Sequence, residues 1–196
     1  SYVDQLSLEA EKTQSVNTVY LKNDKIIGHN TDINGFELAI KDANYDVEGK
    51  KVLILGAGGV VPSVIFALYK MKVLSVTISN RTKIKAENLK TLFNDLKIID
   101  WGEASSFDMI INATSIGLEK EDKLNLDFSK FQNCEFFYDV IYNPKETNFL
   151  RDGKSLGKKT ENGKKMFIYQ AAKSFKIWHG IEPKINEQVV GLLDKW

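Results

Sequence analysis

The sequence is poor in the residues that most often build disulfides and metal sites. Its 196 residues include one cysteine, Cys134, and two histidines, His29 and His179. A single cysteine excludes an intramolecular disulfide and fits a reducing compartment, where it acts most often as a small buried hydrophobe. No Cys/His/Asp cluster has metal-ligand spacing, so we expect no metal. The same shortage leaves no Ser–His–Asp or Cys–His arrangement for nucleophilic catalysis.

Long apolar runs and an excess of one charge are also missing. No apolar stretch approaches the length needed to cross a bilayer, so we expect no membrane partner. The formal net charge is +1 and no basic tract is present, which gives no reason to expect nucleic acid. With 43% hydrophobic and 27% charged residues, the composition is typical of a globular cytoplasmic protein of one large or two small domains.

A glycine turn between a strand and a helix is the most informative feature that is present. Residues 51–55 are rich in Val, Leu and Ile, and an apolar-periodic helix begins near Val60. Gly56 allows a tight turn, and Gly58 lets the backbone approach a phosphate without a Cβ in the way. Val61 replaces the third glycine of the usual fingerprint. The helix N-terminus attracts anions, so we expect a dinucleotide pyrophosphate at Gly56, Ala57, Gly58, Gly59 and Val60.

The end of the next predicted strand indicates which dinucleotide is bound. Residues 74–79 are followed by Asn80-Arg81-Thr82 and then by Lys85. NAD-binding folds usually place Asp or Glu about 20 residues after the glycines, to bind the ribose hydroxyls. A carboxylate would repel a 2′-phosphate, whereas Arg can bind it bidentately. An isolated Asn-Arg-Thr is more often a basic turn that caps a helix, but after this unit NADP is the better interpretation.

Strands and helices alternate along the middle of the chain. Predicted strands at 51–55, 74–79, 96–99, 107–111 and 136–141 are separated by helices through residue 71 and at 83–93, with a mobile loop at 119–128. This alternation predicts an α/β fold with a Rossmann-type, doubly wound parallel sheet. We expect a partial substrate-binding cap from both chain ends. The predicted units are residues 1–45 as a remnant of that cap, 46–160 as the NADP-binding domain, and 161–196 as helices returning to the cap.

Polar clusters near the expected cleft have two interpretations each. Asp32 follows Asn30-Thr31, and such residues are common helix caps. Tyr142 ends an aromatic strand, which is usually core. Met166 and Gln170 share one helix face, either for packing and solvation or for a nicotinamide contact and a substrate hydrogen bond.

Together these segments resemble the shikimate dehydrogenases, an NADP-dependent family that reduces 3-dehydroshikimate in aromatic amino-acid biosynthesis. The resemblance covers nearly the whole chain and rests on the order of seven motifs. They are residues 15–18, 30–35, 56–59, 80–82, 112–117 and 138–144, and Gly163 with Met166 and Gln170.

The resemblance implies a role for each matching residue. The substrate-binding residues are Asn17, Asp32, Tyr142 and Gln170. The residues around the adenosine 2′-phosphate are Asn80, Arg81, Thr82 and Lys85. The residues that line the nicotinamide are Thr114, Ser115, Val140, Gly163 and Met166. In the family a catalytic Asp, here Asp32, pairs with a Lys to handle the proton during hydride transfer.

The family's catalytic Lys and its Ser-x-Ser substrate motif lie upstream of the point where this sequence begins. No lysine here matches, because Lys12 lies on the following helix. We therefore expect the polypeptide as printed to bind NADP but to turn over shikimate negligibly. Two alternatives remain: a non-catalytic NADP-binding module, and a dehydrogenase with a quinate or different substrate preference or with NAD. The expected partner is the small-molecule substrate, shikimate or 3-dehydroshikimate, and the assembly considered is a homodimer.

Overall fold

The computed structural model describes residues 2–131 and 133–193 and contains two separate sheets. The larger sheet has six parallel strands in the order β6-β5-β4-β7-β8-β9. The strands are β4 (Lys51–Leu55), β5 (Ser75–Ser79), β6 (Lys97–Ile99), β7 (Met109–Asn112), β8 (Phe136–Asp139) and β9 (Lys159–Glu161). This is the doubly wound order of dinucleotide-binding folds, so the predicted fold class is confirmed.

The two faces of this sheet carry two hydrophobic cores. Alternate residues of a strand point to opposite faces, so Val52 and Ile54 face one core whereas Leu53 and Leu55 face the other. On the first face lie α2 (Asp32–Asp42), α3 (Val61–Lys70) and α4 (Lys83–Leu89). On the second lie α5 (Asn148–Ser155) and the segment around the 3₁₀ helix η1 (Phe128–Lys130). Burial on both faces explains why the strand sequences are continuously apolar.

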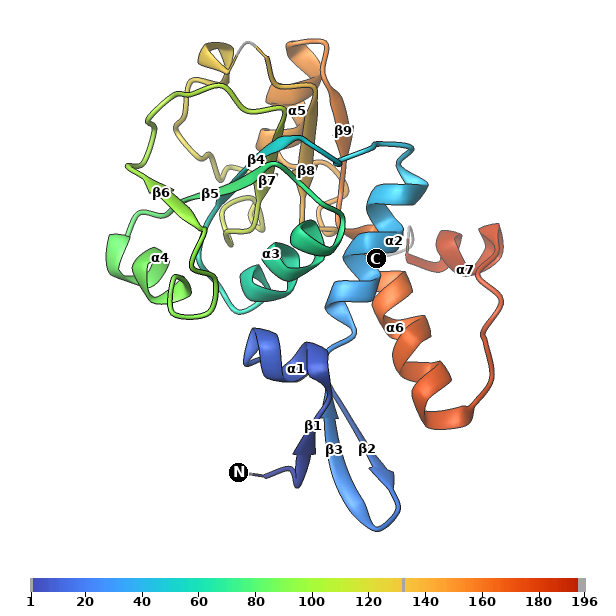
Figure 1. Ribbon diagram of the computed structural model, residues 1–196. Coiled ribbons are helices and arrows are strands. Elements are labelled where there is room, and N and C mark those ends of the chain that lie inside the picture. Colours follow the sequence, from blue (N-terminus) through green and yellow to red (C-terminus); the bar gives the residue numbers. More distant parts are fainter. Residues whose placement is uncertain (1, 132, 194–196) are drawn as a thin grey trace.

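The smaller sheet lies at one end of the molecule and carries the N-terminus (Figure 1). Its order is β1-β3-β2, from β1 (Gln5–Leu6), β2 (Thr18–Lys22) and β3 (Lys25–His29), and α1 (Leu8–Thr13) packs beside it. Asn23 and Asp24 form the two-residue turn of the β2–β3 hairpin, and both have positive φ, 51° and 58°, as such a turn requires. Ser7 caps α1 by accepting from the Ala10 N–H at 3.2 Å.

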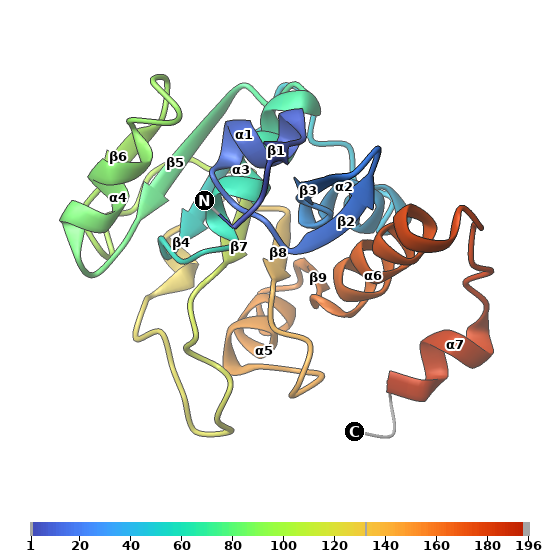
Figure 2. The same ribbon diagram turned by 90° about the horizontal axis from the view of Figure 1, so that it is seen from below.

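Helices α2 and α6 (Lys164–His179) run side by side and join the two ends of the chain (Figure 2). Their closest approach is at Gly35, where a Cβ would lie 2.7 Å from the Met166 carbonyl oxygen. Helix α2 also contributes Phe36 and Ile40 to the core of the large sheet. The domain boundary that we predict at residue 45 falls between α2 and β4, whose residues share this core. The boundary stays a prediction. A last helix, α7 (Glu187–Leu192), follows beyond α6.

Three elements were missed by the sequence patterns, and one was predicted too long. Helix α5, strand β9 and β1 are short, with eight, three and two residues. Helix α4 ends at Leu89 and not at residue 93, because the chain tightens into i→i+3 turns in which the Asn88 carbonyl accepts from the backbone and hydroxyl of Thr91.

Candidate active site

The glycine turn lies at the carboxyl end of β4, where strand order reverses between β4 and β7. Gly56 has φ of 109°, and a Cβ there would lie 2.7 Å from the Ala113 carbonyl oxygen, so only glycine fits between the two loops. At Gly59 a Cβ would meet nothing within 4 Å, and at Gly58 only the Ala113 carbonyl oxygen, 3.8 Å away. These glycines face open space beside the N-terminus of α3, a cradle that suits a pyrophosphate.

The basic turn lies at the end of β5, the neighbour of β4. Asn80 Nδ2 donates to the Thr82 carbonyl at 2.7 Å, and the Thr82 side chain makes no capping bond to α4, although Thr82 occupies the N-cap position. Arg81 and Lys85 are exposed. Sequence reasoning missed Asp100, which follows β6 and reaches this turn. Lys83 Nζ lies 3.0 Å from its carboxylate, so the added negative charge is neutralised by an ion pair.

The segments expected to line the nicotinamide meet at the ends of β7 and β8. Thr114 Cγ2 would lie 3.1 Å from a Cβ on Gly56, so the Thr114–Ser115 loop borders the glycine turn. Gly163, just before α6, fits so closely against Val140 that a Cβ would lie 2.0 Å from the Val140 carbonyl oxygen. Met166 follows on the first turn of α6 and is buried. The structure thus brings Gly56, Thr114, Val140, Gly163 and Met166 to one edge of the sheet.

The substrate side is built from side chains just before β2, at the start of α2 and on α6. Asn17 Oδ1 accepts from the backbone N–H of Thr31 at 2.9 Å and from its hydroxyl at 3.1 Å. Because the oxygen is fixed in this way, Asn17 Nδ2 points at Asp32 and donates to Oδ1 at 2.8 Å. Burial raises the pKa of the Asp32 carboxyl, and the Asn17 hydrogen bond opposes that shift. Asp32 is the first residue of α2, after the N-cap Thr31, and its carboxylate is held by another side chain.

Gln170 joins this cluster, whereas the contact that the structure gives for Tyr142 is with α6. The Thr31 hydroxyl lies 3.4 Å from Gln170 Oε1, and Gln170 Nε2 donates to the Phe167 carbonyl of its own helix at 2.9 Å. Tyr142 is 41% exposed and stacks on Phe167, with ring centroids 4.6 Å apart. Sequence reasoning missed Phe167, because an aromatic residue on an amphipathic helix carries no signal beyond packing.

Ser174 was also missed, and it joins the two ends of the chain. Its hydroxyl lies 2.7 Å from the Thr18 hydroxyl and 3.1 Å from that of Thr31. It is buried on α6, 156 residues from Thr18 in sequence. Only a three-dimensional arrangement could have indicated this cluster.

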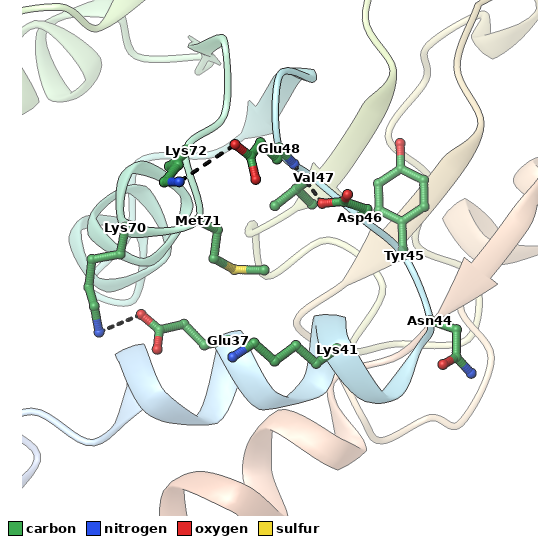
Figure 3. A pocket seen from close by; sticks show the side chains of 10 residues that line it. All are labelled: Glu37, Lys41, Asn44, Tyr45, Asp46, Val47, Glu48, Lys70, Met71 and Lys72. Carbon is green, nitrogen blue, oxygen red and sulfur yellow. Dashed lines mark hydrogen bonds and ion pairs between the residues drawn. The ribbon is translucent and has the colours of Figure 1, made fainter.

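A separate cavity of 580 Å³ lies at the opposite end of β4, between the C-terminal ends of α2 and α3 and residues 44–48 (Figure 3). Two of its three acidic residues form ion pairs, Glu37 with Lys70 at 2.6 Å and Glu48 with Lys72 at 3.6 Å. The third, Asp46, accepts from the Glu48 backbone N–H at 3.0 Å. None of the predicted site residues lines it. Lys12, on α1, is exposed and also lies outside the predicted site.

Residues 2–131 and 133–193 contain no group of three His, Cys, Asp or Glu side chains that could hold a metal ion. Over the same residues, each helix is too short or too polar to span a bilayer.

The fold and this edge define a dinucleotide-binding α/β protein with a half-buried carboxylate, Asp32, on the substrate side of its cofactor cradle. A family profile for Shikimate / quinate 5-dehydrogenase matches residues 37–125, and one for the Shikimate 5′-dehydrogenase C-terminal domain matches residues 165–187. A shikimate dehydrogenase (NADP(+)) of Pelagibacter ubique is 55% identical over 193 residues, which cover 98% of this chain and 73% of the relative. The chain belongs to the shikimate dehydrogenase family.

Solved structures give the same fold. Shikimate 5-dehydrogenase of Thermus thermophilus, in complex with NADP(H) and shikimate, is 31% identical with a TM-score of 0.86, over 98% of this chain and 72% of that one. The 5-ketofructose reductase of a Gluconobacter species is 32% identical with a TM-score of 0.87, over 99% and 73%. These two solved structures are about equally similar to this chain, although they are named for different substrates.

Proposed function

We propose that this protein catalyses the reversible, NADP-dependent reduction of 3-dehydroshikimate to shikimate. The observation that carries the proposal is the Asn17–Asp32 pair. It lies at the start of α2, and on the next turn of this helix Gly35 packs against the carbonyl of Met166, the residue expected at the nicotinamide. A hydrogen-bonded carboxylate beside a cofactor cradle suits proton handling during a carbonyl reduction.

NADPH would supply the hydride for the reduction, and NADP⁺ would accept it in the reverse direction. The open cradle beside Gly58 and Gly59 fits its pyrophosphate, since side chains at these positions would occupy that space. The exposed cations Arg81 and Lys85 would hold the 2′-phosphate. Thr114, Ser115, Val140, Gly163 and Met166 would orient the nicotinamide toward the substrate.

Asn17, Asp32, Tyr142 and Gln170 would bind and orient the hydroxylated ring. Three of these four belong to one hydrogen-bonded cluster, which fixes their directions before substrate arrives. Asp32 would orient and stabilise a cationic proton donor at the reacting oxygen, which in the family is a lysine. Within residues 2–131 and 133–193, the structure gives Asp32 no ion pair.

The test is NADPH formation from shikimate and NADP⁺, measured by absorbance for the chain as printed and for the product of the whole reading frame that contains it. Assays with quinate in place of shikimate test the substrate preference, and assays with NAD⁺ in place of NADP⁺ test the cofactor preference. 5-Ketofructose with NADPH tests the activity of the Gluconobacter relative. NADPH binding without turnover of any substrate by either polypeptide would favour a non-catalytic NADP-binding module. Faster turnover of quinate or 5-ketofructose would contradict the shikimate assignment.

Location and assembly complete the proposal. The buried, single Cys134 supports a reducing compartment such as the cytoplasm, because no intrachain disulfide can form. The exposed apolar side chains of Leu6, Val19, Leu21 and Ile26 support self-association as a homodimer. Sedimentation equilibrium would measure the assembly directly.

A further inference from the structure

The buried carboxylate of Asp139 is not one of the predicted site residues, but it lies between the loops that carry Thr114 and Tyr142. Asp139 ends β8 and is 0% exposed, so it cannot touch substrate or cofactor. One of its oxygens accepts from the Ile141 N–H at 3.0 Å, and the other accepts from the Thr147 hydroxyl at 2.6 Å. Asn112 Nδ2 donates to both oxygens, at 3.1 and 3.2 Å. None of these partners is a cation, so hydrogen bonds alone compensate for the burial of this group.

Asn112 transmits this anchor to the loop after β7. Its Oδ1 accepts from the Thr114 N–H at 3.1 Å and from the Thr114 hydroxyl at 2.7 Å. Its Nδ2 also donates to the Ile116 carbonyl at 3.1 Å. The orientation of the amide is therefore fixed, with the oxygen toward the loop and the nitrogen toward Asp139. One side chain thus holds the backbone on both sides of Ser115.

Thr147 connects Asp139 to the loop after β8. Its hydroxyl donates to Asp139 and also accepts from the Leu150 N–H at 3.3 Å, which caps α5. Gly117, with φ of 121°, packs against it, since a Cβ there would lie 3.1 Å from Thr147 Cγ2. The segment from Val140 to Thr147 carries Tyr142, so the carboxylate joins the loop of Thr114 and Ser115 to the loop of Tyr142.

We propose that Asp139 is a positioning residue that sets the nicotinamide half of the cofactor site. This inference rests on the proposed function. Asp139 acts through Asn112 and Thr147, which hold the loops expected to contact the nicotinamide. The adenosine half is built on the glycine turn and on the end of β5, and no hydrogen bond described above links either of these to Asp139.

The two halves of the cofactor can be tested separately. NADPH probes the whole site, whereas adenosine 2′,5′-bisphosphate probes the adenosine half alone, and calorimetry measures both affinities. Asp139→Asn places an N–H donor against the donors of Asn112 or Thr147. We expect about a tenfold loss of NADPH affinity, comparable to one displaced hydrogen bond, with the bisphosphate affinity unchanged within about twofold.

Two variants of Thr147 guard against a merely structural effect. Thr147→Val keeps the shape but loses the hydroxyl, and should lower NADPH affinity in the same selective way. Thr147→Ser keeps the hydroxyl and should bind both probes as the wild type does. If Asp139→Asn does not fold, Thr147→Val decides the question.

Two results would overturn the inference alone. The first is that Asp139→Asn and Thr147→Val both bind NADPH with wild-type affinity. The second is that these variants lose the same affinity for NADPH and for the bisphosphate. A wild-type protein that binds neither probe would contradict the proposed function, and this inference with it.

Discussion

The two sheets of this protein differ in what covers them. In the large sheet, β4, β7 and β8 are buried on both faces. Helices α2, α3 and α4 cover one face, and α5 and the η1 segment cover the other. In the small sheet, Leu6, Val19, Leu21 and Ile26 are exposed, and the register places them on one face. The cofactor half of the site therefore lies on a fully packed scaffold, whereas Asn17 of the substrate half adjoins a sheet with an uncovered face.

The two halves also differ in how their groups are fixed. The cofactor cradle depends on backbone, on glycines that fit against Ala113 and Val140. The substrate side depends on side-chain hydrogen bonds among Asn17, Thr31 and Asp32. Substitutions on the two sides should accordingly separate turnover from cofactor binding.

The largest effect is expected from Asp32→Asn. In the form of the protein that oxidises shikimate, we expect turnover to fall by about 10²–10⁴-fold, because the carboxylate that orients and stabilises the proton donor is lost. The NADPH dissociation constant should stay within about twofold. Steady-state kinetics and fluorescence titration measure the two quantities.

Asp42→Asn is the matched control, because Asp42 is the last residue of the same helix and pairs with Lys165 away from this cluster. Its turnover should be close to that of the wild type. Unchanged turnover in Asp32→Asn would make Asp32 an ordinary first-turn helix residue.

A comparison of Ile54→Ala with Leu21→Ala tests the difference in packing. Ile54 is fully buried in β4, and we expect its truncation to lower the free energy of unfolding by about 2–5 kcal/mol. Leu21 is 70% exposed on β2, and we expect a loss below about 0.5 kcal/mol. Urea unfolding at one pH measures both. A large loss from Leu21→Ala would show that the open face is covered in solution.

Arg81→Ala tests the cofactor side alone. Loss of a charge-assisted hydrogen bond to the 2′-phosphate should cost about 1.5–3 kcal/mol, which is about tenfold or more in NADPH affinity. NADH affinity should be nearly unchanged, because NADH lacks that phosphate. Lys90→Ala, just past the other end of α4, serves as the control. Equal losses for NADPH and NADH would remove Arg81 from the 2′-phosphate site.

The smallest effect is a pH dependence from Asp139. Burial raises the pKa of its carboxyl to about 6, from an ordinary value of 3.8. The folded state therefore holds this proton more tightly than the unfolded chain. The stabilisation that this gives is complete below the unfolded pKa and is lost as the pH rises through about 6.

Urea titrations at pH 7.5 and 5 can detect this effect. Between them the wild type should gain about 1 kcal/mol of stability relative to Asp139→Asn, in which this group cannot titrate. A stability difference that does not change with pH would mean that Asp139 keeps one charge state across this range.

The positions of many site residues could be predicted from the sequence, because their signals are local. A strand, a glycine turn and a helix are consecutive in the chain, so the cradle at Gly56 and the basic turn at Arg81 followed from short segments. The carboxyl ends of parallel strands meet at one edge, which placed the segments at Thr114 and Val140 there. The roles assigned to these residues stay predictions.

By itself, the sequence determined the parallel α/β fold and the likeness to one family, because apolar periodicity and motif order are properties of neighbouring residues. Only the tertiary structure decided which polar groups act together. The Thr18–Ser174 contact, the Asn112–Asp139–Thr147 cluster and the ion pair that neutralises Asp100 each join segments that are distant in sequence. The partners in the first two are chosen by burial, where an unpaired polar group is costly, and burial exists only once the chain has folded. The exposed pair of Lys83 and Asp100 depends on the sheet, which brings the ends of β5 and β6 together.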